Sequence, residues 1–205
     1  MKKQIKSLSV AFAATLLLGA CASPSKTANE NSANTETSSV SSDTSDTAKT
    51  LVYGTSSYGV GMSDAGLNPH EDYSGWSCVK YGVGETLFRL NENIELVPWL
   101  ADSYKFVDDN TLEVVIKDGI NFSSGRKLDA AAAKECFEDL IAVHDRAPKD
   151  MKIQEIKADG QTITFVTTEP NPALLNFLAE PYTAIIDMQA GVDASKNVSG
   201  TGPYK

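Results

Sequence analysis

The chain has 205 residues, 41% of them hydrophobic, and its 18 basic and 27 acidic side chains give a formal net charge of −9. An acidic chain of this kind is poorly suited to binding nucleic acid or anionic lipid through charge, because both are negatively charged themselves. Two histidines and three cysteines offer few metal ligands, and no His, Cys and carboxylate cluster has metal-ligand spacing.

The first 20 residues have the three parts of a secretory signal peptide. Three lysines precede an uncharged, mostly apolar run over 8–18, and small residues stand just before Cys21. The run is too short to span a membrane as a helix. Leu18-Gly19-Ala20-Cys21 resembles the bacterial lipobox, in which the cysteine receives diacylglycerol and becomes the new N-terminus. We therefore expect residues 1–20 to be removed and Cys21 to be lipidated; a plain signal peptide with a chance cysteine is the alternative.

Residues 21–50 are predicted to form a disordered, lipid-anchored tether. They are almost all small or polar, rich in Ser, Thr and Asn, and Val40 is the only large apolar residue after Cys21. Such a segment cannot bury enough apolar surface to offset the entropy lost on ordering. Removal of the signal peptide, with its three lysines, would change the net charge to −12. Residues 51–205 remain, enough for one compact domain.

The first part of that domain combines a strand, a long loop and a helix. Residues 51–55 are predicted to be a strand, and residues 56–73, rich in Gly, Ser, Asn, Asp and Pro, a long loop of the kind that often has a function. Apolar residues then recur at helical spacing and predict a helix that contains two glycines. These apolar residues are Trp76, Val79, Val83 and Leu87. A turn follows at residues 91–93.

The rest of the domain alternates hairpins and helices. Turn residues 108–110 join predicted strands over 104–107 and 111–117, and Asp159-Gly160 joins strands over 153–157 and 162–167. Between the hairpins a helix is capped by Asp129 and has an apolar stripe. The stripe consists of Ala133, Cys136, Phe137, Leu140 and Ile141. A shorter helix is predicted over 172–178 and a strand over 182–188, so the order of elements indicates a mixed α/β fold.

Two cysteines belong to this domain. Cys78 and Cys136 could form a disulfide, or both could be small buried residues with free thiols. We favour the free thiols.

Four stretches after residue 50 follow one another in the order and spacing of a known family. They are Leu67-Asn68-Pro69-His70; Gly84-Glu85-Thr86-Leu87-Phe88 with residues 97–104; residues 116–125; and Gly200-Thr201-Gly202-Pro203-Tyr204. They resemble motifs of the oligopeptide-, dipeptide- and nickel-binding proteins of ABC importers, the family 5 extracellular solute-binding proteins. Most of these residues are suited to a scaffold, so the resemblance predicts a fold before it predicts a ligand.

The resemblance implies a type II periplasmic-binding-protein-like fold, in which two lobes close on a ligand by a hinge. Members of the family are more than twice as long as this chain. We therefore expect residues 51–205 to form part of the first lobe, with a hairpin-rich subdomain at about 75–178 and with the second lobe absent. The implied protein is a monomer that serves an ABC permease and ATPase. It would be lipid-anchored outside a single-membrane bacterium, or on the periplasmic side if there are two membranes.

Within the family, the sequence is most similar to the nickel-uptake branch. The reasons are the stretches 67–70 and 97–101, and the implied ligand is a small peptide or a nickel chelate, with nickel as cargo and no resident cofactor. The resemblance implies aromatic side chains and an arginine for the ligand's carboxylate, with any metal-contacting histidine in the second lobe. Residues 180–183, where the arginine is expected, contain none, and no tryptophan is found between Asp145 and Met151.

Several side chains are candidates for contact with a ligand, each with a structural alternative. The aromatic ones could stack on a ligand or belong to the core, the histidine could be a ligand or a structural hydrogen-bonding residue, and the arginine could bind a carboxylate or form a surface ion pair. They are Trp76, Tyr73, Tyr58, His70 and Arg89. His144, near the end of a predicted helix, is expected to be structural, as a cation at the helix C-terminus.

An enzyme is not expected. Nucleophilic catalysis needs a nucleophile placed beside a base, but the two histidines stand in unrelated sequence contexts and Gly-x-Ser-x-Gly is missing. Asp108-Asp109 lies in a hairpin turn, a solvated position. A surface lipoprotein that acts as an adhesin or signalling precursor is the other alternative, but it would make the four motifs a coincidence.

Overall fold

The computed structural model describes residues 66–191 and 197–204, all within the second of two units into which the chain divides, residues 53–205. The predicted signal peptide, tether and first strand, and Tyr58, lie outside the described residues. The described elements are α1 (Ser74–Lys80), β1 (Phe88–Leu90), β2 (Leu96–Pro98), β3 (Ala101–Asp108), β4 (Thr111–Ile116), α2 (Ala130–Val143), α3 (Ala147–Met151), β5 (Ile153–Asp159), β6 (Thr162–Thr167), α4 (Leu174–Phe177) and the 3-10 helix η1 (Pro181–Thr183). None of these helices has both the length and the apolarity needed to cross a bilayer.

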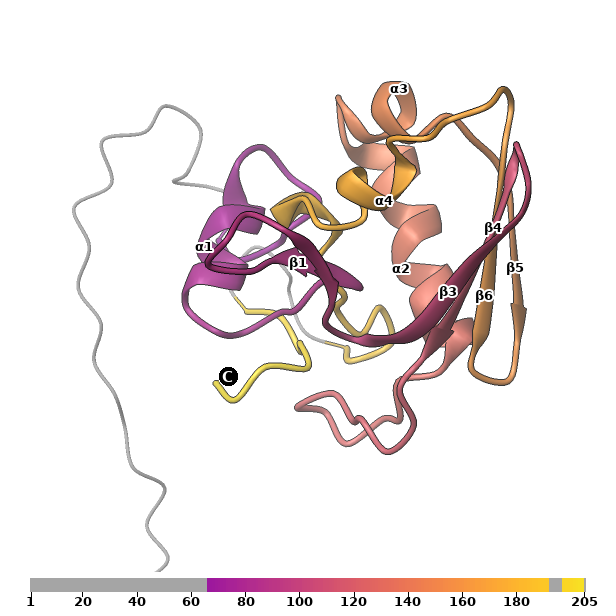
Figure 1. Ribbon diagram of the computed structural model, residues 1–205. Helices are drawn as coiled ribbons and strands as arrows, with labels where there is room; N and C mark the ends of the chain where they lie inside the picture. Colours follow the sequence, from indigo (N-terminus) through magenta and orange to yellow (C-terminus); the bar gives the residue numbers. More distant parts are fainter. Residues whose placement is uncertain (1–65, 192–196, 205) are drawn as a thin grey trace, which may run out of the picture. The chain divides into compact units, whose positions relative to one another are not determined.

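The two predicted hairpins are confirmed and join into one antiparallel sheet of order β3-β4-β6-β5 (Figure 1). Strands β4 and β6 alternate between buried and half-buried residues, the period expected when one face of a sheet is covered. Helix α2 packs against β5 and β6, where Phe137 and Phe165 meet edge to face with ring centroids 5.0 Å apart. The core of the domain therefore lies between this helix and the sheet.

Helix α2 has the start and the buried face that the sequence predicts. Asp129 is the N-cap, and its side chain accepts a hydrogen bond of 2.8 Å from the backbone N–H of Ala132. Such a cap contributes about 1 kcal/mol to helix stability. Cys136, Phe137 and Leu140 are buried on the face toward the sheet. Cys78 and Cys136 are both buried and free, as favoured from the sequence.

The predicted helix that begins near Trp76 is shorter than its apolar spacing indicates. Helix α1 ends at Lys80, because Gly82 adopts a positive φ of 67°, a left-handed conformation that stops a right-handed helix. Val83 and Leu87 are buried after the helix has ended. Their spacing therefore reflects burial in the core and not continued helix.

Two predicted elements near the C-terminal end were wrong in extent or type. The short helix begins at Leu174, not at Pro172. The predicted strand over 182–188 is absent from the described residues; η1 stands at its start, and Ile185 and Ile186 each make one isolated bridge, to Glu85 and Gly200 respectively. These isoleucines are buried, and a short buried apolar run resembles a strand in sequence.

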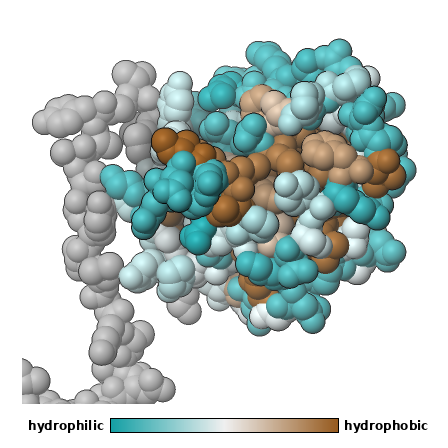
Figure 2. Space-filling view, viewed as in Figure 1, coloured by the Kyte–Doolittle hydropathy of each residue, from teal (hydrophilic) through white to brown (hydrophobic). Residues whose placement is uncertain are grey.

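Two elements were not predicted. Strands β1 and β2 pair around the predicted turn at residues 91–93, where the Asn91 side chain accepts hydrogen bonds from the backbone N–H groups of Asn93 and Glu95. Helix α3 follows α2 directly. On the face seen in Figure 1, hydrophobic side chains gather in a band over β1 and β3 (Figure 2). The exposed large side chains of these two strands include Leu90, Tyr104 and Phe106.

The Gly-Thr-Gly-Pro-Tyr stretch packs its backbone directly against the chain after α1. A Cβ on Gly200 would lie 2.0 Å from the carbonyl oxygen of Val83, and one on Gly202 would lie 2.1 Å from that of Gly82. Distances this short force the backbone to move. These glycines are therefore required for close approach of two segments.

Replacing Gly200 with alanine is expected to destabilise the fold by about 3 kcal/mol, because the new methyl group cannot be accommodated without moving the backbone. Thermal unfolding followed by circular dichroism measures the effect. Gly160→Ala is the control, since a Cβ there meets nothing within 4 Å and only the positive φ of 57° is strained, at a cost of about 1 kcal/mol. Equal losses of stability in the two variants would contradict the steric account.

Candidate ligand pocket

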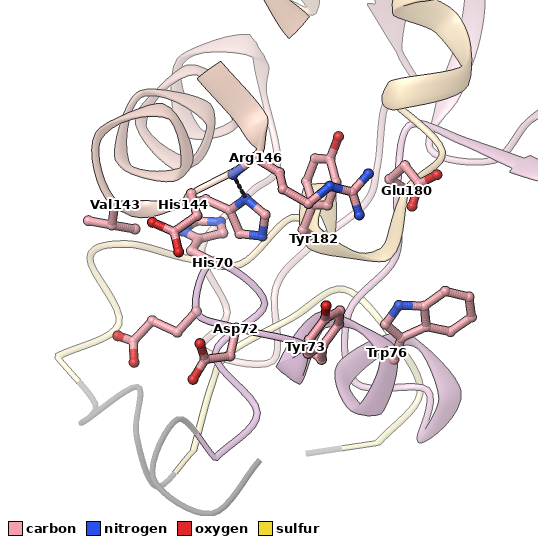
Figure 3. Close-up of a pocket in the computed structure, with 12 residues that line it drawn as sticks. His70, Asp72, Tyr73, Trp76, Val143, His144, Arg146, Glu180 and Tyr182 are labelled. Carbon is pink, nitrogen blue, oxygen red and sulfur yellow. Dashed lines mark hydrogen bonds between the residues drawn. The ribbon is translucent and has the colours of Figure 1, made fainter. Parts of the chain in front are cut away.

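A pocket of about 320 Å³ lies where three segments distant in sequence meet. One segment is residues 70–76, the second is the turn that follows α2, and the third surrounds η1. Figure 3 shows Tyr73 and Trp76 on one side and Arg146 and Tyr182 on the other, with His144 beside Arg146. The pocket thus exists only because the tertiary fold brings these segments together.

Aromatic side chains, one guanidinium group and four carboxylates line the pocket; the carboxylates are Glu71, Asp72, Asp145 and Glu180. Tyr73 and Trp76 are each 62% exposed, so much of each ring is open to solvent. The Arg146 guanidinium lies 5.7 Å from the centroid of the Tyr182 ring. Asp150 accepts a hydrogen bond of 3.1 Å from Arg146 Nη2 and one of 3.2 Å from the Tyr182 hydroxyl. Burial raises the pKa of Tyr182, so this hydroxyl stays a donor at neutral pH.

His144 joins the walls of the pocket. Its Nδ1 accepts hydrogen bonds from the backbone N–H groups of Arg146 and Ala147, at 3.1 and 3.0 Å. Its ring also hydrogen-bonds the backbone of Asp72, and it stacks on Tyr182 with centroids 4.6 Å apart. Burial lowers the pKa of His144. The residue is structural, as expected, but the expected reason was wrong, since a nitrogen that accepts two hydrogen bonds belongs to a neutral ring.

His70 is fully buried at the back of the pocket. Its Nδ1 lies 2.7 Å from Asp139 Oδ2, and its Nε2 lies 3.3 Å from Cys136 Sγ. A carboxylate can only accept, so Nδ1 carries the proton and Nε2 accepts from the thiol. Burial lowers the pKa of His70, while Asp139 opposes this effect. Both ring nitrogens are therefore occupied within the protein.

The Cys136, His70 and Asp139 side chains have the connectivity of a nucleophile, a base and an orienting carboxylate. However, burial raises the pKa of the Cys136 thiol to about 12, so the reactive thiolate does not form at neutral pH. The thiol also accepts a hydrogen bond from the backbone N–H of Ile186, within the core. The arrangement therefore ties the pocket to α2 and does not present a nucleophile to a substrate.

Comparison with known proteins places the chain in a family. The family model described as "Bacterial extracellular solute-binding proteins, family 5 Middle" matches residues 95–205. The chain belongs to this family. Its mixed α/β fold class is thereby confirmed.

Individual relatives of this family 5 protein include two kinds of binding protein. The chain is 36% identical over 127 residues to the nickel-binding protein NikA of Staphylococcus aureus, which covers 62% of this chain and 26% of that protein. It is 30% identical over 157 residues to the glutathione-binding protein GsiB of Salmonella paratyphi A, covering 71% of this chain and 30% of that protein. The chain thus spans less than a third of the length of these relatives.

Solved structures of family members agree with the fold. The structure of NikA from Staphylococcus aureus in complex with Ni(L-His)₂ superposes with a TM-score of 0.66 at 33% identity, over 71% of this chain and 31% of that one. A nickel ABC transporter structure from Bacillus halodurans gives a TM-score of 0.65 at 33% identity, over 70% and 30% of the two chains.

The structure brings together only some of the side chains selected from the sequence. Trp76, Tyr73 and His70 line the pocket. Arg89 is not among the lining residues; it stacks on Trp99, with its guanidinium carbon 5.0 Å from the ring centroid. Ligand contact at these side chains stays a prediction.

Sequence reasoning missed Arg146, Glu180 and Tyr182, which also line the pocket of this family 5 protein. Residues 180–183 lack the arginine that the family resemblance implies, but Arg146 occupies the space beside Tyr182 from a different element. The view that the two histidines stand in unrelated contexts was also wrong, since both line this pocket. No local sequence pattern indicates this proximity, because it arises only when the fold packs the segment around His70 against the end of α2.

Proposed function

We propose that this protein captures a nickel chelate outside the cell and presents it to an ABC permease and its ATPase. The observation that carries the proposal is the likeness to two nickel proteins, the NikA of Staphylococcus aureus at 36% identity and the Bacillus halodurans transporter at 33%. The chelate is the substrate, with its nickel bound by small organic ligands such as histidine. Among the described residues there is no group of three or more His, Cys, Asp or Glu that could hold the metal directly.

The pocket supports a ligand of this kind. Arg146 offers N–H groups in a fork that matches the two oxygens of a chelator carboxylate. Tyr73 and Trp76 present exposed ring faces on which a planar group such as imidazole can stack. Both interactions depend on the chelator and not on the metal. We propose that these three side chains form this lobe's contribution to ligand binding.

Binding of glutathione or another small peptide is the second candidate, favoured by the 30% identity to GsiB. A thermal-shift panel on the intact protein distinguishes the two, with Ni(II) plus L-histidine against glutathione and di- and oligopeptides. A chelate present at about 100 times its Kd would stabilise the protein by about 2.7 kcal/mol. Nickel alone and histidine alone are the controls. A shift with glutathione or peptides only would favour the second candidate, and no shift with any ligand would contradict both.

We also propose that the protein is held at the outer face of the cell membrane by lipid on Cys21. The lysine-rich start, the short apolar run and Leu18-Gly19-Ala20-Cys21 support this attachment. Residues 21–50 would then be the tether. An anchored binding protein stays near its importer, where a free one would diffuse away from a cell with one membrane.

A further inference from the structure

We infer that His144 is a positioning residue of the ligand pocket, which holds two of its walls together only as a neutral imidazole, so that mild acid weakens ligand binding. This inference rests on the proposed function, because it concerns the same pocket. The two walls are the segment that contains Asp72 and Tyr73 and the turn that contains Arg146.

The imidazole contacts both walls through different atoms. Nδ1 accepts from the backbone N–H groups of Arg146 and Ala147, and Figure 3 draws the first of these bonds. Because Nδ1 is an acceptor, the nitrogen that donates to the backbone of Asp72 is Nε2. One face of the ring packs on Tyr182. A single side chain therefore fixes the backbone on either side of the space in which Arg146 and Tyr73 face each other.

Protonation would break this arrangement at one atom. An imidazolium ion carries a hydrogen on Nδ1, which would then point at two backbone N–H donors instead of accepting from them. His144 is only 8% exposed, so water does not readily replace the lost acceptor. The turn after α2 must move to relieve the conflict. Because that turn carries Arg146, its guanidinium moves with it.

Charged and titratable groups surround His144 from each segment packed against it. Its own turn and α3 contribute Asp145, Arg146 and Asp150, and the segment before α1 contributes Asp72, Glu71 and His70. Tyr182 and Glu180 stand at η1. Burial, followed by Arg146, lowers the pKa of His144, while Asp145, the bond to Asp72 and Asp150 act in the opposite direction.

The direction of the pH effect follows from that balance. Burial holds the pKa of His144 in the folded protein below the ordinary histidine value of about 6.5, so folding and pocket geometry both favour the neutral ring. The stability that the neutral ring contributes is fully present above about pH 6.5. It is lost as the pH falls through the lower pKa of His144 in the folded state. We therefore expect binding to be intact at neutral pH and weakened in mild acid.

The test compares the intact wild-type protein with His144→Asn between pH 7.5 and about pH 5.5. An asparagine side-chain oxygen accepts from backbone N–H groups two and three residues ahead, as in an Asx turn, but does not titrate in this range. Binding of Ni(II) with two equivalents of L-histidine is measured by calorimetry, with each variant referred to its own affinity at pH 7.5. Since the chelate itself weakens in acid, only the difference between the variants counts. Amide hydrogen exchange of Arg146 and Ala147 is followed without ligand.

The expected result is that the wild-type protein loses about tenfold more affinity than His144→Asn over this range, the equivalent of one pKa unit. The protection of its two amides should fall over the same pH interval. Parallel affinity profiles, or constant amide protection in the wild type, would overturn the inference. If the wild type binds no ligand at pH 7.5, the proposed function fails and amide protection still decides the role of His144. If His144→Asn does not fold, the wild-type amides decide it alone.

Discussion

Replacing Arg146 with alanine is expected to weaken binding of Ni(II)–L-histidine by about tenfold to a hundredfold. A hydrogen bond between charged groups contributes about 1.5–3 kcal/mol, and removal of the guanidinium would leave the chelator carboxylate without its partner. The side chain lines the pocket beside Tyr182. Calorimetry on the intact protein measures the loss. Arg146→Lys should fall between wild type and alanine, because lysine keeps the charge but not the planar fork.

The matched control for this experiment is Arg89→Ala. Arg89 was the arginine selected from the sequence, but it packs on Trp99 and does not line the pocket. Its removal should therefore leave affinity unchanged. Because Arg146 also pairs with Asp150, thermal unfolding of each variant must show that the fold persists. Equal affinities of Arg146→Ala and Arg89→Ala would contradict the assignment of Arg146.

Replacing Cys21 with serine is expected to abolish lipid attachment and to release the protein from the membrane. A serine has no thiol to receive diacylglycerol. Each buried CH₂ of an acyl chain contributes about 0.8 kcal/mol, so loss of all chains removes the anchor completely. The measurement is incorporation of labelled palmitate in cells that express the protein, together with its distribution between the membrane fraction and the medium.

Cys78→Ser is the control, since Cys78 is buried in the folded domain and far along the chain from the signal. It should incorporate label as the wild type does. Label that persists in Cys21→Ser, or that disappears in Cys78→Ser, would contradict lipidation at Cys21. Retention of the unlabelled variant in the membrane fraction would show that something other than lipid holds the protein there.

The comparison of Arg146 with Arg89 illustrates how far residue type alone can identify a binding site. In the sequence, Arg89 lies next to a family motif while Arg146 lies in a stretch without one. In the structure, both guanidinium groups pack on aromatic rings. Only the packing of the segment around His70 against the end of α2 distinguishes them. The family resemblance implies an arginine after the short helix, where the chain has Tyr182 instead. The guanidinium reaches this ring from a turn about 36 residues earlier, which no local pattern encodes.

The sequence by itself determined the elements whose signals are local. Asp129 caps α2, Asp159-Gly160 turns the second hairpin, and the alternation in β4 and β6 specifies their buried face, because each depends on neighbouring residues and on the period of the backbone. The order of four motifs also identified the family, which the comparison confirmed.

Only the tertiary structure decided what residues 182–188 become and which side chains share a pocket. In each case an apolar or polar residue meets partners distant in sequence: Ile185 and Ile186 are buried without a strand, and His144 holds Arg146 against the segment of Asp72. Long-range packing overrides local pattern at such positions, because the free energy of burial and of buried hydrogen bonds exceeds the small preferences of single residues for helix or strand.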